Sequence, residues 1–359
     1  MVMTVNIQMK LKRFMKEIKE GAILNDRKKY FNNFVKVFLI GISFLCFASC
    51  GEQKKLNAQT EFAFGTVCTV NLFDDGTEEL YREIFTLVNS IEKKFSVNIS
   101  NSEISLINQN AAKNKVEVSE DVYSLIEFSK EMSLLTENAF NPALGSLIKL
   151  WAIGTDRQRV PAKDEIEELI KYCNPQKIVL EKTDEKYFVY LTDEKTQIDL
   201  GGIVKGFATD KIVELLKAKN VKRAIIDLGG NIYVFGKKSE TAGEENWKVG
   251  IKNPIDQSAE PIKIVSVNST SVVTSGNYER FFIQDGKRYH HIIDSKSGMP
   301  VENGLASVTI ISEKSVVCDA FSTACFAGGV ELAEKLVKME NLGKIRIIFV
   351  TFDGKIREL

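Results

Sequence analysis

The stretch QIDLGGIVKGFATD, residues 197–210, decides how this chain folds around its functional centre. The apolar residues that end at Leu200 indicate the end of a buried strand, and the pair Gly201-Gly202 permits a tight turn. Apolar residues at helical spacing then follow over 207–216. A strand, a glycine turn and a helix N-terminus present free backbone N–H groups around one point, and Lys205 lies beside them. Such a point suits an anion such as a phosphate.

The same glycine phrase recurs further along the chain. Asp199 opens Asp-Leu-Gly-Gly at the tip of the expected strand, and Asp227 opens the same four residues after a second apolar run. The two strands and the helix between them therefore predict a compact βαβ-like unit with two glycine turns. The sequence favours this unit as the place of the chemistry.

The first 50 residues have the features of an export signal. The apolar run over 37–49 is too short to span a bilayer, and basic residues precede it. It ends in Ala48-Ser49-Cys50, which resembles a bacterial lipobox, in which the cysteine is lipidated and becomes the new N-terminus. We expect a signal peptide over 1–49, a lipidated N-terminus and tether over 50–60, and an exported protein that Cys50 anchors to a bacterial membrane. The alternative is a buried helix that ends at an incidental cysteine.

The composition after the signal limits the possible functions. Residues 1–49 hold 9 Lys and Arg against 3 Asp and Glu, which leaves 39 against 45 and a net charge of −6 in the rest. A mildly acidic chain without a basic stripe disfavours nucleic-acid binding. The later cysteines are widely spaced without a CxxC pair, so they predict buried thiols rather than a zinc site or a disulfide framework. They are Cys68, Cys173, Cys318 and Cys325.

Helices and strands follow one another without strict alternation over 61–359. This pattern predicts a single α+β domain rather than a doubly wound sheet. Helices are expected over 78–95, from Ser119, and over 142–151, 160–172, 315–326 and 330–339. Strands are expected over 61–73 with Phe64-Gly65-Thr66 inside it, and over 178–180, 187–191, 247–251, 262–267, 280–284, 288–293, 305–311, 345–352 and 356–359.

Two oxygen-bearing residues lie one turn apart on the expected helix over 315–326. Asp319 and Thr323 stand at i and i+4, so their oxygens face the same way. A carboxylate, a hydroxyl and a backbone carbonyl would together suit a hard cation such as Mg²⁺. An aspartate that only complements the helix dipole is the alternative, and the spacing alone favours that alternative.

The two histidines of the chain, His290 and His291, are neighbours on an expected strand. Their side chains therefore point to opposite faces, and one of them at most can enter a given site. His291 with Asp294 could assist proton transfer, because an imidazole titrates near neutral pH. A surface histidine beside a turn is an equally good interpretation. Residues 274–278 suit either a ligand contact or a simple turn, and a turn is the better interpretation when they are taken alone.

Eight short motifs occur together in one order, and together they are far more specific than any one of them. They resemble the motifs of the ApbE family, the FAD:protein FMN transferases, from about Glu61 to the C-terminus. Members of this family are typically exported lipoproteins. The motifs are Phe64-Gly65-Thr66, Ala139 to Pro142, Asp199 to Gly206, Asp227 to Asn231, Gly250 to Pro254, Thr274 to Tyr278, His291 to Asp294, and Asp319 to Thr323.

The resemblance implies a single T-fold-like α+β domain with FAD in a cleft between two lobes, and Mg²⁺ on the pyrophosphate of FAD. The implied Mg²⁺ ligands are Asp319, Thr323 and the backbone carbonyl of Gly202. His291 matches a histidine that the family needs for activity, and Asp294 would orient it. The implied FAD contacts are Phe64, Ala139, Phe140, Asn141, Asp199, Lys205 and Ile293. Phe64 replaces a usual methionine and Asn141 a common aspartate, which affects flavin contact more than the metal site.

The implied reaction is transfer of FMN from FAD to a threonine or serine hydroxyl of a partner protein, with release of AMP. The implied acceptors are flavoprotein subunits of membrane redox complexes. Two alternatives stay open: an FAD pyrophosphatase that releases FMN and AMP, and a non-catalytic lipoprotein that binds flavin. The transferase and the pyrophosphatase share every residue named above, so the sequence does not separate them.

Overall fold

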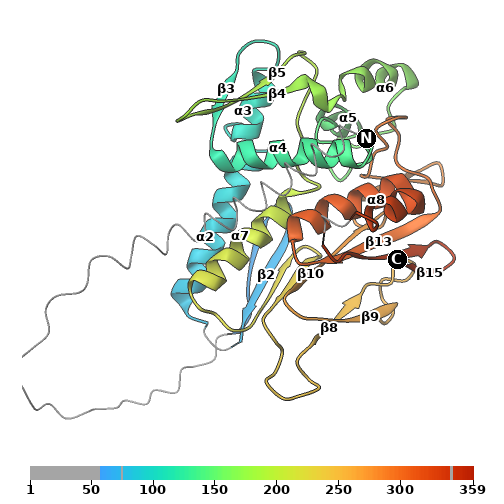
Figure 1. Ribbon diagram of the computed structural model, residues 1–359. Coiled ribbons are helices and arrows are strands. Elements are labelled where there is room, and N and C mark those ends of the chain that lie inside the picture. The colour runs from blue at the N-terminus through green and yellow to red at the C-terminus, as the bar shows by residue number, and fades with distance from the viewer. Residues whose placement is uncertain (1–56, 74–75, 340–342) are drawn as a thin grey trace, which may run out of the picture. The chain divides into compact units, whose positions relative to one another are not determined.

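An antiparallel sheet of eight strands forms the centre of the fold (Figure 1). The computed structural model describes residues 57–73, 76–339 and 343–359. Every neighbouring pair of strands in this sheet is antiparallel, and its long helices are segregated to one side of it. The predicted α+β class is therefore confirmed. The order is β1 (Gln59–Ala63), β2 (Thr66–Leu72), β6 (Ala224–Leu228), β7 (Asn231–Phe235), β10 (Thr270–Gly276), β13 (Leu305–Ser312), β14 (Arg346–Thr351) and β15 (Ile356–Glu358).

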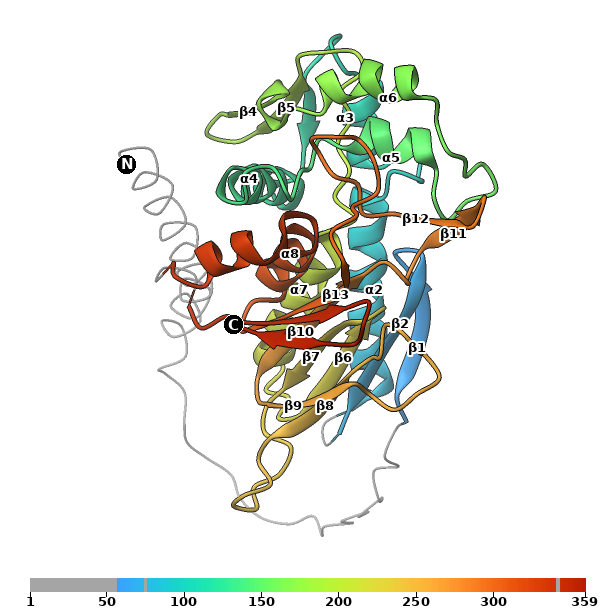
Figure 2. The ribbon, with the colours of Figure 1, turned by 90° about the vertical axis from the view of Figure 1, so that its right-hand side faces the viewer.

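Three long helices lie on one side of this sheet (Figure 2). They are α2 (Glu78–Phe95), α7 (Val204–Ala218) and α8 (Ser315–Leu336), and α7 packs against both of the others. The side chain of Thr77 accepts a hydrogen bond from Leu80 N and so begins α2. The apolar face of α2 is buried as its spacing predicts. The buried residues are Leu80, Tyr81, Ile84, Phe85, Val88, Ile91 and Phe95.

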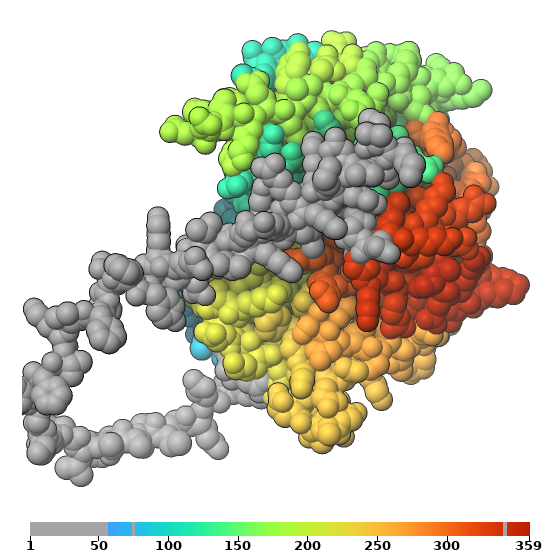
Figure 3. Space-filling model, in the orientation of Figure 1, coloured from blue at the N-terminus to red at the C-terminus, as the bar shows by residue number. Residues whose placement is uncertain are grey.

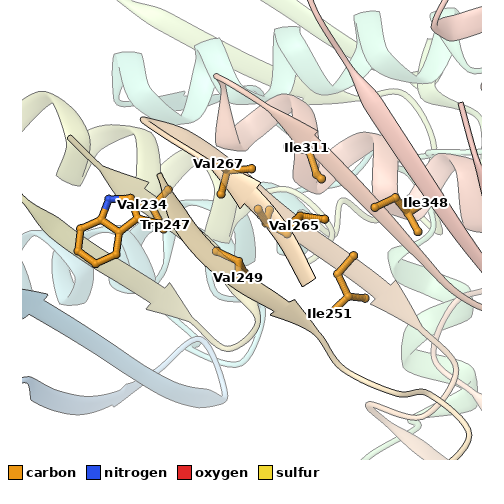
Figure 4. Packing of buried hydrophobic residues seen from close by; sticks show 9 residues of the cluster. Val234, Trp247, Val249, Ile251, Val265, Val267, Ile311 and Ile348 are labelled. Atoms are coloured by element: carbon orange, nitrogen blue, oxygen red, sulfur yellow. The ribbon is translucent and has the colours of Figure 1, made fainter. Parts of the chain in front are cut away.

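A two-stranded ribbon covers the opposite face. It consists of β8 (Trp247–Ile251) and β9 (Lys263–Val267), and its inward side chains pack on the sheet (Figure 4). Trp247 Nε1 donates to Gly236 O at 2.8 Å, so the buried indole keeps its hydrogen bond. The cluster contains Val234, Trp247, Val249, Ile251, Val265, Val267, Val272, Ile311 and Ile348.

A smaller sheet with the remaining described helices forms the other end of the same unit, and its green residues are seen at one end of Figure 3. The sheet has the order β3 (Val116–Val118), β5 (Tyr187–Leu191), β4 (Ile178–Lys182). A hairpin of β11 (Phe281–Gln284) and β12 (Lys287–His290) packs here through the stacked rings of Phe282 and Tyr289. The helices are α3 (Glu103–Gln109), α4 (Glu120–Leu135), α5 (Gly145–Trp151), α6 (Lys163–Leu169), and the 3₁₀ turns Ile170–Tyr172 and Pro175–Lys177.

The strand expected over 61–73 is two strands joined by a hairpin turn. Phe64 and Gly65 both have positive φ, 53° and 69°, between the paired residues Ala63 and Thr66. Two consecutive residues with positive φ form the two-residue turn that matches the twist of a hairpin. The prediction was wrong because the turn places a phenylalanine where asparagine or aspartate is usual.

The strand expected before the first glycine turn is also absent. Residues 197–200 form only an isolated bridge, and Ile198 instead exchanges two hydrogen bonds with the side chain of Asn108, at 2.7 and 2.9 Å. Asp199 N donates to Pro142 O at 3.0 Å. A side-chain amide thus takes the place of a neighbouring strand, so the expected βαβ-like unit is a buried loop, a helix and the hairpin β6–β7.

The last long helix combines two of the expected helices. In α8 only Gly329 departs from helical geometry, at φ 70°, where the sequence predicts a break. Among the described residues α8 alone is long and apolar enough to cross a membrane, but 61% of its most apolar window is buried, as in a core helix. The expected signal peptide over 1–49 and Cys50 lie outside the described residues, and Cys68, Cys173, Cys318 and Cys325 are buried free thiols as predicted.

Candidate active site

The N-terminal ends of α7 and α8 meet around a buried carboxylate. Asp319 on α8 is 4% exposed, and its Oδ2 accepts Gly206 N of α7 at 2.8 Å. A Cβ on Gly206 would lie 2.4 Å from Ser315 O, so only glycine permits this approach of the two helices. Asp210 on α7 in turn accepts the amides of Ser315 and Val316 at 3.0 and 3.1 Å. The position of Asp319 is therefore fixed by both helices.

A set of hydroxyl groups surrounds the second predicted ligand, Thr323. Ser322 Oγ donates to Asp319 O at 2.9 Å, so the 2.8 Å contact between Ser275 and Ser322 uses the proton of Ser275. The contacts of Thr323 Oγ1, to Ser275 Oγ and to Asp319 O, are both 3.4 Å. Hydrogen bonds of this length are weak, so the Thr323 oxygen keeps lone pairs for a ligand.

The third predicted ligand lies beside this hydroxyl. A Cβ on Gly202 would be 3.4 Å from Thr323 Oγ1 and 3.5 Å from Cε2 of Phe140. The turn that carries Gly202 is thus in contact with α8, although the two are far apart in the sequence. A carboxylate, a hydroxyl and a backbone carbonyl are the hard oxygen donors that suit Mg²⁺, so these residues fit the implied cation. Over the described residues, no group of three or more His, Cys, Asp and Glu forms an alternative metal site.

Lys205 and Asp199 complete the first glycine turn. Lys205 Nζ lies 3.7 Å from Asp319 Oδ1 and 3.5 Å from Gly201 O. Asp199 Oδ1 accepts Gly201 N at 2.8 Å, and burial raises the pKa of Asp199 against the effect of that hydrogen bond and of Arg280. The carboxylate of Asp199 therefore shapes the turn, and Lys205 supplies a positive charge at its mouth.

The loop over 139–142 packs against this turn. Asn141 Nδ2 donates to Cys173 O at 2.9 Å, and its Oδ1 accepts Ala143 N at 2.8 Å. An aspartate could not donate to a carbonyl, so the asparagine suits this loop. Phe140 is 4% exposed with its ring toward Gly202, and Ala139 N donates to Thr136 O at 3.0 Å. The loop therefore holds Phe140 beside the predicted metal ligands.

Two hairpin turns lie side by side at one end of the large sheet. Phe64 N donates to Glu92 Oε1 at 2.7 Å, which holds the β1–β2 turn on α2. A Cβ on Gly229 would meet Thr66 at 2.4 Å, so the β6–β7 turn touches the first one. Asp227 Oδ1 accepts Gly230 N at 2.8 Å, and burial raises the pKa of Asp227. Both glycine phrases therefore use their aspartate in the same way, as an acceptor for the turn.

The two histidines have different environments. His290 is buried: its Nε2 donates to Val301 O at 2.9 Å and its Nδ1 accepts Ile292 N at 3.3 Å. His291 is half-buried, and its Nδ1 lies 3.2 Å from Arg280 O. Because a carbonyl only accepts, Nδ1 carries the proton and Nε2 presents a lone pair. Burial and the charge of Arg280 lower the pKa of His291 to about 3, so it is neutral at pH 7.

In the segment after His291, the carboxylate of Asp294 stabilises the turn that follows it. The oxygens of Asp294 accept the amides of Lys296 at 3.2 Å and Ser297 at 3.0 Å, whereas the Nδ1 partner of His291 is a carbonyl. The expected orientation of His291 by Asp294 is thus wrong, because the carboxylate is used by its own turn. Ile293 is 4% exposed in a hydrophobic cluster, so only its backbone is left for a flavin contact.

The expected site residues fall into two groups. Around Asp319 the fold joins Gly202, Lys205, Thr323 and Phe140, and the charges of Lys205 and Arg280 act on His291. Phe64 lies at the hairpin end of the sheet, beside the second glycine turn. Sequence reasoning missed four residues that position the others. They are Glu92, Asp210, Arg280 and Ser275. Asp210 ends the stretch 197–210 and Ser275 lies within residues 274–278, but neither was singled out there.

Comparisons with known proteins agree with this geometry. Residues 64–349 match the model of the ApbE family. The FAD:protein FMN transferase of Treponema pallidum is 36% identical over 323 residues, which cover 86% of this chain and 89% of that protein. A Klebsiella pneumoniae protein of the same name is 37% identical over 274 residues, covering 76% and 83%.

Solved structures are similar as well. The ApbE protein of Thermotoga maritima superimposes with a TM-score of 0.74 at 31% identity, covering 84% of this chain and 96% of that one. The apo form of the Pseudomonas stutzeri flavinyl transferase ApbE gives 0.71 at 26% identity, covering 84% and 93%. Family model, relatives and fold all agree, and this chain therefore belongs to the ApbE family.

Proposed function

We propose that this protein is an FAD:protein FMN transferase that uses Mg²⁺ and moves FMN to a threonine or serine hydroxyl of a partner flavoprotein. Its membership of a family whose curated relatives carry that name makes it a transferase. One observation carries the finer proposal: the junction of α7 and α8 brings Asp319, Thr323, Gly202 and Lys205 together. These are the oxygen donors and the positive charge that a diphosphate with a divalent cation requires.

Different residues of the site would contact the cation, the pyrophosphate, and the flavin or adenosine of FAD. Asp319 Oδ1, Thr323 Oγ1 and the carbonyl of Gly202 would hold Mg²⁺, which when bound supplies neutralisation of the negative charge on the pyrophosphate. Lys205 would pair with the same pyrophosphate. Phe140 and the hairpin turn at Phe64 would contact the flavin or the adenosine, and Ala139, Asn141, Asp199 and Ile293 would position the loops around it.

His291 would accept the proton of the acceptor hydroxyl at Nε2. The hydroxyl oxygen forms a bond to the FMN-side phosphorus, the bond from that phosphorus to the bridging oxygen breaks, and AMP leaves with the electron pair. The hydrogen bond from Nδ1 to Arg280 O supports this role, because it fixes the tautomer that has a free lone pair at Nε2. Asp294 would act by holding the turn that follows His291.

We also propose that the protein is exported and anchored by a lipid. Cys50, lipidated after removal of residues 1–49, would anchor the protein to a bacterial membrane, and its acceptors would be flavoprotein subunits of membrane redox complexes. A net charge of −6 after the signal supports anchoring by the lipid rather than by a basic surface.

The decisive experiment is mass spectrometry of a candidate acceptor domain after incubation with the protein, FAD and Mg²⁺. The expected result is a mass gain equal to FMN less one water, because the acceptor hydroxyl forms a phosphoester while AMP leaves. This gain should disappear with EDTA and with Asp319→Ala. Free FMN and AMP without an adduct would identify a pyrophosphatase, in which water replaces the hydroxyl. Neither product, with FAD still bound, would leave a flavin-binding protein.

A further inference from the structure

Lys205 lies beside the carboxylate oxygen of Asp319 that does not bond the helix α7 amide. Its Nζ lies 3.7 Å from Oδ1, while Oδ2 accepts Gly206 N at 2.8 Å. The side chains of Lys205 and Asp319 are 21% and 5% exposed, so water screens this pair little. The second contact of the ammonium, with Gly201 O, is 3.5 Å and too long to hold it firmly.

This arrangement conflicts with a bound cation at the same oxygen. A nearly buried carboxylate needs a compensating positive charge, and here the ammonium supplies it. A divalent cation on Oδ1 would compensate the same charge and repel the ammonium. A lysine head group on a four-carbon stem can move, whereas Asp319 is held by the amide of Gly206 and by its own helix.

We propose that Lys205 exchanges partners: it neutralises Asp319 while the site lacks a cation, and it moves to the diphosphate of FAD when a divalent cation takes Oδ1. The exchange rests on the proposed function, because it needs both ligands in one site. When a cation binds alone, it displaces the Lys205 ammonium, which then has no new partner. When FAD binds alone, its diphosphate must compete with Asp319 for the same ammonium. Each ligand therefore raises the affinity for the other, and linkage makes the two factors equal.

The first test measures the cation alone. Mn²⁺ is titrated into the full-length protein without FAD, and free Mn²⁺ is followed by electron paramagnetic resonance. Lys205→Met keeps most of the stem but removes the charge, so it is expected to bind Mn²⁺ ~tenfold more tightly than the wild type. An unchanged or weaker affinity in this variant would overturn the exchange.

The second test measures FAD alone, in EDTA, through its fluorescence. Asp319→Asn keeps an oxygen that can accept Gly206 N but removes the charge that holds Lys205. This variant is expected to bind FAD several-fold more tightly than the wild type, because Lys205 is released. Equal or weaker binding of FAD by Asp319→Asn counts against the proposal.

Lys211→Met is the matched control. Lys211 lies on the same helix and pairs with Asp121 at 3.1 Å, but this ion pair lies outside the proposed site and is more exposed, with side-chain exposures of 36% and 35%. Its loss is expected to leave both affinities unchanged, and thermal unfolding checks that every variant is folded. A wild type that binds neither Mn²⁺ nor FAD would defeat the proposed function. Binding of both, with wild-type affinities in Lys205→Met and Asp319→Asn, would defeat only the exchange.

Discussion

Asp210 and Asp319 each cap the helix on which the other lies. Asp210 on α7 accepts the first amides of α8, from Ser315 and Val316, and Asp319 on α8 accepts Gly206 N in the first turn of α7. Negative charge at a helix N-terminus is favourable for both helices. The carboxylate proposed to hold a cation is thus also part of the helix–helix joint.

Removal of the cap on α8 should lower stability. Asp210→Ala leaves two backbone donors without their acceptor, and we expect a loss of about 1–2 kcal/mol in the free energy of unfolding. Urea unfolding followed by circular dichroism measures it. Asp156→Ala, at an exposed aspartate in the turn after α5, is the control and should cost little. Equal stability of both variants would contradict the reciprocal capping.

Loss of the Ser275 hydroxyl should weaken cation binding. Ser275 donates to Ser322, and its Oγ is one of two acceptors that lie 3.4 Å from Thr323 Oγ1; the other is Asp319 O. Ser275→Ala therefore leaves Asp319 O alone to keep the Thr323 proton turned away from the cation. A weak hydrogen bond of about 0.5 kcal/mol corresponds to a loss of roughly twofold in Mn²⁺ affinity. Ser275→Thr, which keeps the hydroxyl, should restore binding.

The neighbouring residue offers a matched control for that experiment. Thr274 points to the other face of β10, where its Oγ1 bonds Thr309 Oγ1 at 2.8 Å. Thr274→Val also removes one half-buried hydroxyl, but it should leave Mn²⁺ affinity unchanged. A similar loss of affinity in both variants would mean that the strand as a whole, not the Ser275 hydroxyl, sets the position of Thr323.

His291 should stay neutral far below its usual range. Its pKa is about 3 in the folded protein against a usual value of 6.5, so kcat/KM should show no fall with a pKa near 6.5 as the pH drops from 8 to 5. His291→Gln should lower kcat by about 10²-fold or more at every pH in that range. An acid limb near pH 6.5 that is lost in His291→Gln would show that the imidazole is not protected from protonation.

The same pKa shift predicts how stability depends on pH. Between pH 6.5 and 3 the unfolded chain binds a proton at His291 that the folded protein does not bind, so stability falls as the pH falls through this window. Above pH 6.5 the contribution is fully present. The melting temperature of the wild type should therefore drop more between pH 7 and pH 4.5 than that of His291→Gln. Parallel curves for the two proteins would contradict this.

We expect the Phe64 side chain to lower the stability of the fold and to contribute to FAD binding. A phenylalanine at φ 53° is strained, and asparagine before Gly65 is a preferred pair for this turn. Phe64→Asn should raise the free energy of unfolding by about 0.5–1 kcal/mol and weaken FAD binding. Urea unfolding and FAD titration measure the two effects. A variant that is both more stable and equally good at binding FAD would remove Phe64 from the flavin site.

Much of the fold follows from local patterns. The apolar spacing over 78–95 predicts α2 because a helix buries one face, and the break at Gly329 follows from its conformational freedom. The ordered motifs also identified the family, because their order along the chain does not depend on the sequence or structure of the segments between them.

Long-range partners explain what local patterns missed. Residues 198–200 look like a strand, but the side chain of Asn108, ninety residues earlier, takes the hydrogen bonds that a strand would make. Asp294 looks like the partner of His291, yet a carbonyl on another segment takes that place.

The sequence by itself supplied the residues on which the proposed chemistry rests: the glycine turns, the oxygen pair Asp319 and Thr323 at helical spacing, and the histidine beside a turn. The tertiary structure decided which of these residues meet and what each one is bonded to. The contact of Gly206 with Ser315 sets the distance between α7 and α8, and that distance puts Lys205 on Asp319. No local pattern contains this information, because the hydrogen bonds and charges involved join segments that only the folded chain brings together.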